Sequence, residues 1–200
     1  MSTPETPHGP GEPRIAGNDR PSAYMTGLTA PLSELPWSAD FVMQAIEILP
    51  VALRGGKIWS YSPEHADSFV IGWPTGEKPE EVAARTVERL GLPPDILHST
   101  SWRHSGNEVV LTYVCVVDAS APPPDSWRTL PVERAELARG DETAPPQHIA
   151  VDQVREHALR HLAWLTNDDP VIKERLVGWG PALSRYVPEP FRAFAGAPPA

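Results

Sequence analysis

Apolar residues gather along the chain into short runs that glycine and proline separate. The run at 46–53 predicts a buried strand, and the Arg-Gly-Gly-Lys sequence at 54–57 predicts a tight turn, because glycine readily adopts the positive φ of hairpin turns. Residues 57–61 alternate polar and apolar side chains, which is typical of the return strand, and 68–71 is a further short strand. The first part of the chain is therefore predicted to be a hairpin followed by a third strand.

A helix is predicted over 78–90. Pro79 stands in its first turn with two glutamates after it, and Gly91 marks its end. Thr75 or Glu77 is expected near its start, and the preceding residues form a loop rich in glycine.

The second half of the chain predicts two more strands and two helices. Residues 96–103 and 108–117 are expected to be strands joined by a turn at 104–107, and the second strand is almost wholly apolar, as in a sheet centre buried on both faces. Apolar residues at helical spacing predict a long helix over 151–165 that covers one face of the sheet, and a short helix is expected at 171–177.

The chain has 25 prolines among 200 residues, and they cluster. Residues 1–35 hold several prolines and few apolar residues, so we expect a disordered tail ahead of a single domain at 36–195. The prolines at 122–124 and 145–146 cannot continue a helix or a central strand, which predicts loops there.

The formal net charge of −9, without a cluster of Lys or Arg, disfavours nucleic-acid and anionic-membrane partners. No apolar run approaches the length of a membrane helix, and the N-terminal residues do not resemble a secretory signal. The single cysteine, Cys115, lies in an apolar run and is interpreted as a small buried hydrophobe. Together these features predict a cytoplasmic protein.

The segment 72–92 carries a family resemblance. It reads GWPTGEKPEEVAARTVERLGL, and it resembles a Nudix box, whose pattern is Gly, five residues, Glu, seven residues, then Arg-Glu-aliphatic-x-Glu-Glu-x-Gly-aliphatic. From Glu77, the seven-residue spacing reaches Arg85, and Val87 takes the aliphatic position. The resemblance covers 45–165 in element order. It implies the α/β (α+β) class, as a Nudix-like α/β/α sandwich with a mixed sheet.

This sequence departs from the family pattern where the chemistry resides. Nudix hydrolases hold divalent cations, usually magnesium, with the glutamates of the box, but the corresponding positions here carry Thr86, Arg89 and Leu90. The first glycine is also displaced by one residue. Aligning on Gly91 instead places Glu88 at one glutamate position, so either alignment leaves at most one metal ligand.

The other acids of the segment are the remaining candidates for chemistry. Glu77, Glu81 and Glu88 are the candidate catalytic residues, although Glu81 and Glu88 stand at the spacing of ordinary surface pairs with Arg85. Trp73, Arg85 and Arg89 are the tentative ligand-binding residues. We assign no metal ligands and expect no cofactor, with magnesium required only if the relocated acids support catalysis.

Histidines and tryptophans supply weaker signals. His157 and His161 have the i,i+4 spacing of zinc ligands but are interpreted as histidines at the boundary of an apolar helix face, and His98 and His104 as members of a hairpin face. Seven tryptophans occur, and four of them surround the predicted sheet, where core packing is favoured over stacking on a base or sugar. These four are Trp37, Trp59, Trp73 and Trp102.

Three functional hypotheses remain. The leading one is a catalytically inactive Nudix-like protein that serves as a ligand-binding, regulatory or protein-interaction module. The alternative is a divergent metal-dependent pyrophosphohydrolase that acts on a nucleoside diphosphate derivative. The third is an interaction protein that uses its Pro-rich tail and tryptophans as contacts. The expected partner is a small molecule or a protein, and the family resemblance also implies a homodimer.

Overall fold

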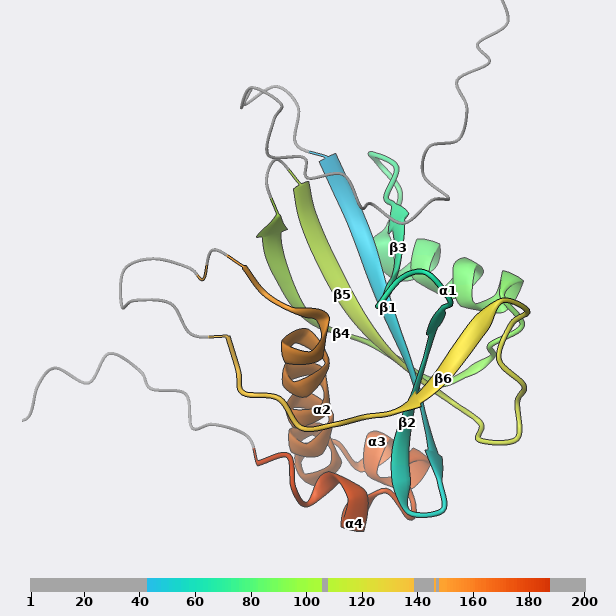
Figure 1. The fold of residues 1–200 in the computed structure, drawn as a ribbon, viewed down its shortest axis with the longest axis vertical. Coiled ribbons are helices and arrows are strands. Elements are labelled where there is room, and N and C mark those ends of the chain that lie inside the picture. The colour runs from blue at the N-terminus through green and yellow to red at the C-terminus, as the bar shows by residue number, and fades with distance from the viewer. Residues whose placement is uncertain (1–42, 106–107, 139–145, 147, 188–200) are drawn as a thin grey trace, which may run out of the picture.

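The computed structural model describes residues 43–105, 108–138, 146 and 148–187. In this part of the chain, six strands form one sheet that four helices accompany (Figure 1). In chain order the elements are β1 (Met43–Arg54), β2 (Lys57–Pro63), β3 (Phe69–Gly72), α1 (Pro79–Arg89), β4 (Pro94–Ser105), β5 (Glu108–Val117), β6 (Trp127–Pro131), α2 (Val151–Asp168), α3 (Pro170–Arg175) and α4 (Gly180–Leu183).

The sheet is mixed. Its strand order is β4-β5-β1-β2-β6, and β3 pairs with the first half of β1. β1 and β5 run parallel, whereas every other described pair is antiparallel. The prediction that the apolar strand β5 lies inside the sheet is confirmed, because β4 and β1 flank it on either side.

Two apolar clusters cover the two faces of the sheet. On one face Ile46 and Ile48 of β1 belong to the same cluster as Val87 of α1. On the other face Leu49 belongs to the same cluster as Leu162 of α2, and α3 and α4 extend that cover. Side chains alternate along a strand, so one strand supplies both clusters. The expected α/β/α sandwich with a mixed sheet is confirmed (Figure 1).

The β1–β2 hairpin turns at the two glycines that the sequence pattern singled out. Gly55 and Gly56 have φ angles of 55° and 73°, and Arg54 pairs with Lys57 across the turn. Glycine adopts positive φ angles at little steric cost, so Gly-Gly suits a turn that needs two of them in succession. The turn therefore fixes the register that sends Ile58 into the α2 face.

Several boundaries differ from the expectations. β1 begins three residues earlier and β4 extends in both directions, while β6 and α4 were not predicted at all. β6 ends in Pro131 and has no fully buried residue, so it lacks the apolar alternation that marks a strand. Lys78, without a side-chain cap, stands at the N-cap of α1 in place of Thr75 or Glu77. The short helix expected at 171–177 spans Pro170–Arg175.

Some of the predicted segments and residues lie outside the part of the chain that the structure describes. The predicted tail at 1–35, Trp37, Pro145 and residues 106–107 of the expected turn lie outside the described residues. The loop prediction at 122–124 is confirmed. Among the described helices, none is both long and apolar enough to cross a membrane.

Cys115 has the structural role that the sequence suggested. Its side chain is fully buried in the α1-face cluster. Burial raises the pKa of the thiol to about 12, so the reactive thiolate is suppressed at neutral pH.

A buried carboxylate ties the chain after β6 to α2. Glu156 is 1% exposed and accepts hydrogen bonds from both Arg134 Nε (2.9 Å) and Arg134 Nη2 (2.8 Å), and from Arg160 Nε (2.8 Å). Burial by itself would raise the pKa of Glu156, but the hydrogen bonds from Arg134 and Arg160 hold it below its ordinary value. Arg134 also donates to the Arg185 carbonyl at 2.6 Å, so this contact joins three segments.

Candidate functional site

The box segment, residues 72–92, folds as a compact loop followed by α1. Trp73 is half-buried; its backbone N–H donates to the Gln44 carbonyl at 2.8 Å, and its indole Nε1 donates to the Glu77 carbonyl at 2.6 Å. Gly76 has a φ of 90°, which turns the chain toward the helix. The hydrogen bond from the Trp73 indole thus stabilises the loop at 73–77.

The three candidate glutamates do not meet in a described pocket. Glu77, Glu81 and Glu88 are all exposed. The Glu77 carboxylate is bonded to Arg85, and Glu81 pairs with Lys78 at 3.1 Å. The expected surface pairs of Arg85 with Glu81 and Glu88 are therefore replaced by a contact that folds the loop back onto the helix.

The residues of the box segment do not fit magnesium. Mg²⁺ requires oxygen ligands in near-octahedral geometry, usually one or two carboxylates with waters and substrate phosphates. The Thr86 hydroxyl instead donates to the Val82 carbonyl at 2.7 Å, Leu90 offers hydrocarbon and Arg89 a positive charge. Across the described residues, no three His, Cys, Asp or Glu side chains form a group that could hold a metal ion.

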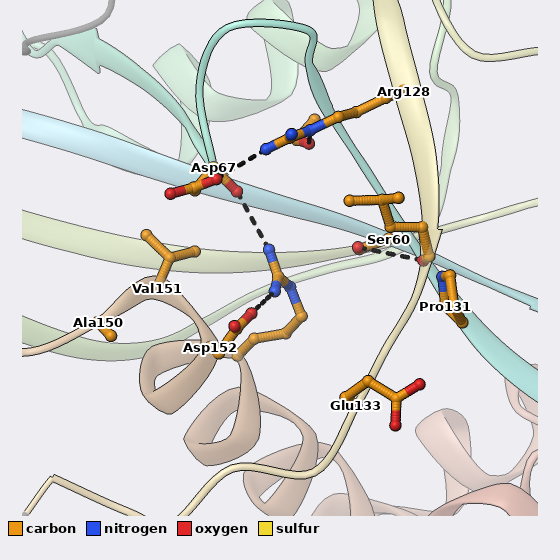
Figure 2. A pocket seen from close by; sticks show the side chains of 11 residues that line it. Ser60, Asp67, Arg128, Pro131, Glu133, Ala150, Val151 and Asp152 are labelled. Carbon is orange, nitrogen blue, oxygen red and sulfur yellow. Dashed lines mark hydrogen bonds and ion pairs between the residues drawn. The ribbon is translucent and has the colours of Figure 1, made fainter.

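A pocket of about 470 Å³ lies on the opposite, α2 face of the sheet. Figure 2 shows side chains converging on it from β2, β6, the β2–β3 loop and the first turns of α2. Its volume lies in the range of small-molecule sites. The lining residues are Ser60, Ser62, Asp67, Arg128, Leu130, Pro131, Glu133, Ala150, Val151, Asp152 and Arg155.

Arg128 of β6 forms one wall of this α2-face pocket. Its Nε donates to Ser62 Oγ at 3.2 Å, and its Nη2 donates to the Ala66 carbonyl at 3.3 Å and to Asp67 Oδ1 at 2.7 Å (Figure 2). The Asp67 side chain is 77% exposed, so its bond to Arg128 is open to solvent and weak. A ligand oxygen can therefore compete with Asp67 for the guanidinium.

Arg155 of α2 forms the facing wall. It is 9% exposed, bonds to Asp152 one turn earlier, and donates from Nη2 to the Asp67 carbonyl at 3.1 Å. Its Nε is buried and has no hydrogen-bond partner among the described residues. A buried N–H without an acceptor is costly, so an acceptor atom of a ligand or water that came within hydrogen-bond distance of it would be stabilising.

A second buried carboxylate, outside the pocket lining, binds the β2–β3 loop. Glu47 of β1 is 0% exposed; it accepts from both terminal nitrogens of Arg103 (2.6 and 3.0 Å), from the Thr112 hydroxyl (2.9 Å) and from the Ser68 hydroxyl (2.8 Å). We call these four residues the Glu47 network. Ser68 follows Asp67, so the network anchors the loop that carries the pocket rim.

Two histidines meet elsewhere on the α2 face. Nε2 of His98 on β4 lies 3.2 Å from Nε2 of His161 on α2. Burial lowers the pKa of both imidazoles, and for His161 the nearby His98 and His157 lower it further. His157 and His161 both lie on α2 with the expected i,i+4 spacing, but the polar contact described for His161 is with His98.

Sequence reasoning missed the arginines of the pocket. The tentative ligand-binding residues Trp73, Arg85 and Arg89 all lie on the box segment, away from the pocket lining. Arg128 stands on the unpredicted strand β6, and Arg155 has the sequence appearance of a polar position on an amphipathic helix. The only available signal was an arginine beside the apolar stripe of that helix.

Comparisons with known proteins find similarity only at the level of the backbone. No family model matches the chain, and no curated protein matches it. The crystal structure of C. elegans Ap4A hydrolase is 14% identical, covers 46% of this chain and 82% of its own, and has a TM-score of 0.36. A candidate nudix hydrolase family member from Chromobacterium violaceum is 13% identical over 76% of this chain and 97% of its own, with a TM-score of 0.42. Neither similarity assigns a function to this chain.

Proposed function

We propose that this chain is a Nudix-like ligand-binding module without pyrophosphohydrolase activity, and that its ligand occupies the α2-face pocket. The observation that carries the proposal is the buried Arg155 Nε in the pocket wall, which lacks an acceptor among the described residues. The substitutions at the box positions support the second half of the proposal, because Thr86, Arg89 and Leu90 cannot replace carboxylate ligands.

The polar lining defines the class of ligand. Arg128 and Arg155 donate hydrogen bonds, and the buried hydroxyls of Ser60 and Ser62 can donate or accept them. The lining also holds three carboxylates, so its net charge does not favour a ligand with several negative charges. These carboxylates belong to Asp67, Glu133 and Asp152. The ligand that fits best is rich in acceptor oxygens and neutral or singly charged, about the size of a sugar phosphate or a mononucleoside.

Calorimetry with the full chain tests the binding half of the proposal. The titrants are ribose 5-phosphate, adenosine, AMP and ADP-ribose, each in EDTA. Arg155→Lys keeps the positive charge but deletes the Nε donor, and Arg175→Lys on the exposed side of α3 is the matched control. A hydrogen bond from a charged group contributes about 1.5–3 kcal/mol, so we expect about 10- to 100-fold weaker binding in Arg155→Lys only. Equal affinity in the two variants would contradict the assignment to this pocket.

A second experiment tests the absence of hydrolysis. The chain is incubated with ADP-ribose and other nucleoside diphosphate derivatives in Mg²⁺ or Mn²⁺, and the release of mononucleotide is followed. We expect no turnover and no calorimetric signal for either metal ion at the box segment. Turnover that Glu77→Gln or Glu88→Gln abolishes would establish the divergent hydrolase instead, and pocket binding could still hold in that case.

A further inference from the structure

The His98–His161 contact is a cross-element pair with defined geometry. The Nε2 atoms lie 3.2 Å apart, while the ring centroids are 5.2 Å apart with an interplanar angle of 22°. The nitrogens are closer than the centroids, so both rings turn their Nε2 edges toward each other. The Trp164 ring lies 5.5 Å from the His161 ring and flanks the pair.

The separation of the two nitrogens suits one metal ion. Zinc binds imidazole nitrogen at about 2.0–2.1 Å in tetrahedral geometry, which places two such nitrogens about 3.3 Å apart. Imidazole is also the ligand that zinc, nickel and copper accept most readily from proteins.

Two other polar side chains, His157 and Asp169, lie near the pair and act electrostatically on it. His157 is exposed one helical turn before His161, on the same side of α2. Asp169, at the end of α2, acts electrostatically on His98. No group of three such side chains converges within the described residues, so the pair itself is the site and water completes the coordination.

We propose that His98 and His161 form a site for a transition-metal ion of the zinc class at the seam between β4 and α2. The site is separate from both the box segment and the α2-face pocket, since neither histidine lines that pocket. An ion held there would join the edge strand of the sheet to the helix that covers it. Metal binding should therefore raise the melting temperature of the protein.

Zinc calorimetry on the full chain without a polyhistidine tag tests the proposal. The variants are His98→Gln and His161→Gln, with His65→Gln in the β2–β3 loop as the matched control, because His65 is exposed and distant in sequence from both. We expect one zinc per chain, at least tenfold weaker binding in each of the two variants, and unchanged binding in the control. Binding that survives His98→Gln but disappears in His157→Gln overturns the proposal, since the ligands would then be the i,i+4 pair on α2.

A spectroscopic measurement on the unmodified protein guards against variants that fail to fold. Zinc should shift the imidazole NMR resonances of two histidines together, and the electron paramagnetic resonance spectrum of the Cu²⁺ form should show coupling to at least two nitrogens. The absence of zinc binding, or a copper spectrum with a single coupled nitrogen, overturns the proposal and leaves the contact as a hydrogen bond between two neutral imidazoles.

Discussion

Removing Arg103 should destabilise the fold more than removing Glu47, its partner in the Glu47 network. Glu47 is 0% exposed, whereas the Arg103 side chain is 19% exposed. Arg103→Met therefore leaves a buried carboxylate with only the hydroxyls of Thr112 and Ser68 as donors. Loss of one partner of a buried ion pair costs about 3–5 kcal/mol. Glu47→Met should cost less, about 1.5–3 kcal/mol, because the guanidinium can turn toward water.

The double variant separates the two contributions. When both charges are replaced by methionine, no charged group remains buried without a partner, and such replacements are often neutral or stabilising. We expect Glu47→Met/Arg103→Met to be more stable than Arg103→Met alone, with a coupling of at least about 1 kcal/mol between the two sites.

Urea unfolding followed by circular dichroism measures these differences. With an m-value of about 2 kcal/mol/M, a loss of 3–5 kcal/mol lowers the unfolding midpoint by about 1.5–2.5 M. Arg175→Met on the exposed side of α3 should leave the midpoint unchanged. If the double variant loses the sum of the two single losses, Glu47 and Arg103 do not act as a pair and the reasoning is wrong.

Three further predictions follow from other buried groups. The pKa of Glu156 is held below its ordinary value, so its stabilising effect should be complete at pH 7 and lost as the pH falls below about 4. The difference in unfolding free energy between the unmodified chain and Glu156→Gln should therefore shrink over that range. A difference that stays constant with pH would contradict this prediction. Leu162→Ala, at a fully buried position against the sheet, should cost about 2–5 kcal/mol in urea unfolding, whereas the exposed Val177→Ala should cost less than about 0.5 kcal/mol. The Cys115 thiol should resist a thiol reagent at pH 8 until the protein unfolds, and rapid labelling of the folded protein would refute its burial.

Local patterns predicted the framework, because they depend on neighbours in the sequence. The glycines at 55 and 56, the apolar run of β5 and the helical spacing of α2 each specify one element, and each is present. β6 was missed because an edge strand with only partly buried side chains shows no such alternation. The spacing of apolar residues thus predicts elements that bury a full face, and it does not predict an edge strand such as β6.

The pocket could not be predicted, because its contacts join residues distant in the sequence. Arg155 reaches a carbonyl 88 positions away, and Arg128 reaches a carboxylate 61 positions away. The His98–His161 pair similarly spans 63 positions. Glu47 stands inside an apolar run, and only the register of β1 with β5 places it beside Thr112. These contacts follow from the topology of the sheet, which the order of elements alone did not specify.

In the described part of the chain, the buried Glu47, Arg155 and Glu156 lie on the α2 face, and contacts on this face hold the rim of the pocket. The β2–β3 loop is anchored three times: Ser68 bonds to Glu47 of β1, the Asp67 carboxylate to Arg128 of β6, and the Asp67 carbonyl to Arg155 of α2. Of these three contacts only Asp67–Arg128 is an ion pair, and because it is open to solvent it adds little to the stability of the fold. We infer that these anchors serve to hold the pocket rim in place, because a rim fixed before binding loses less conformational entropy when the ligand arrives. On this argument Ser68→Ala, which changes a side chain outside the pocket lining, should weaken ligand binding while leaving most of the stability of the Glu47 network intact.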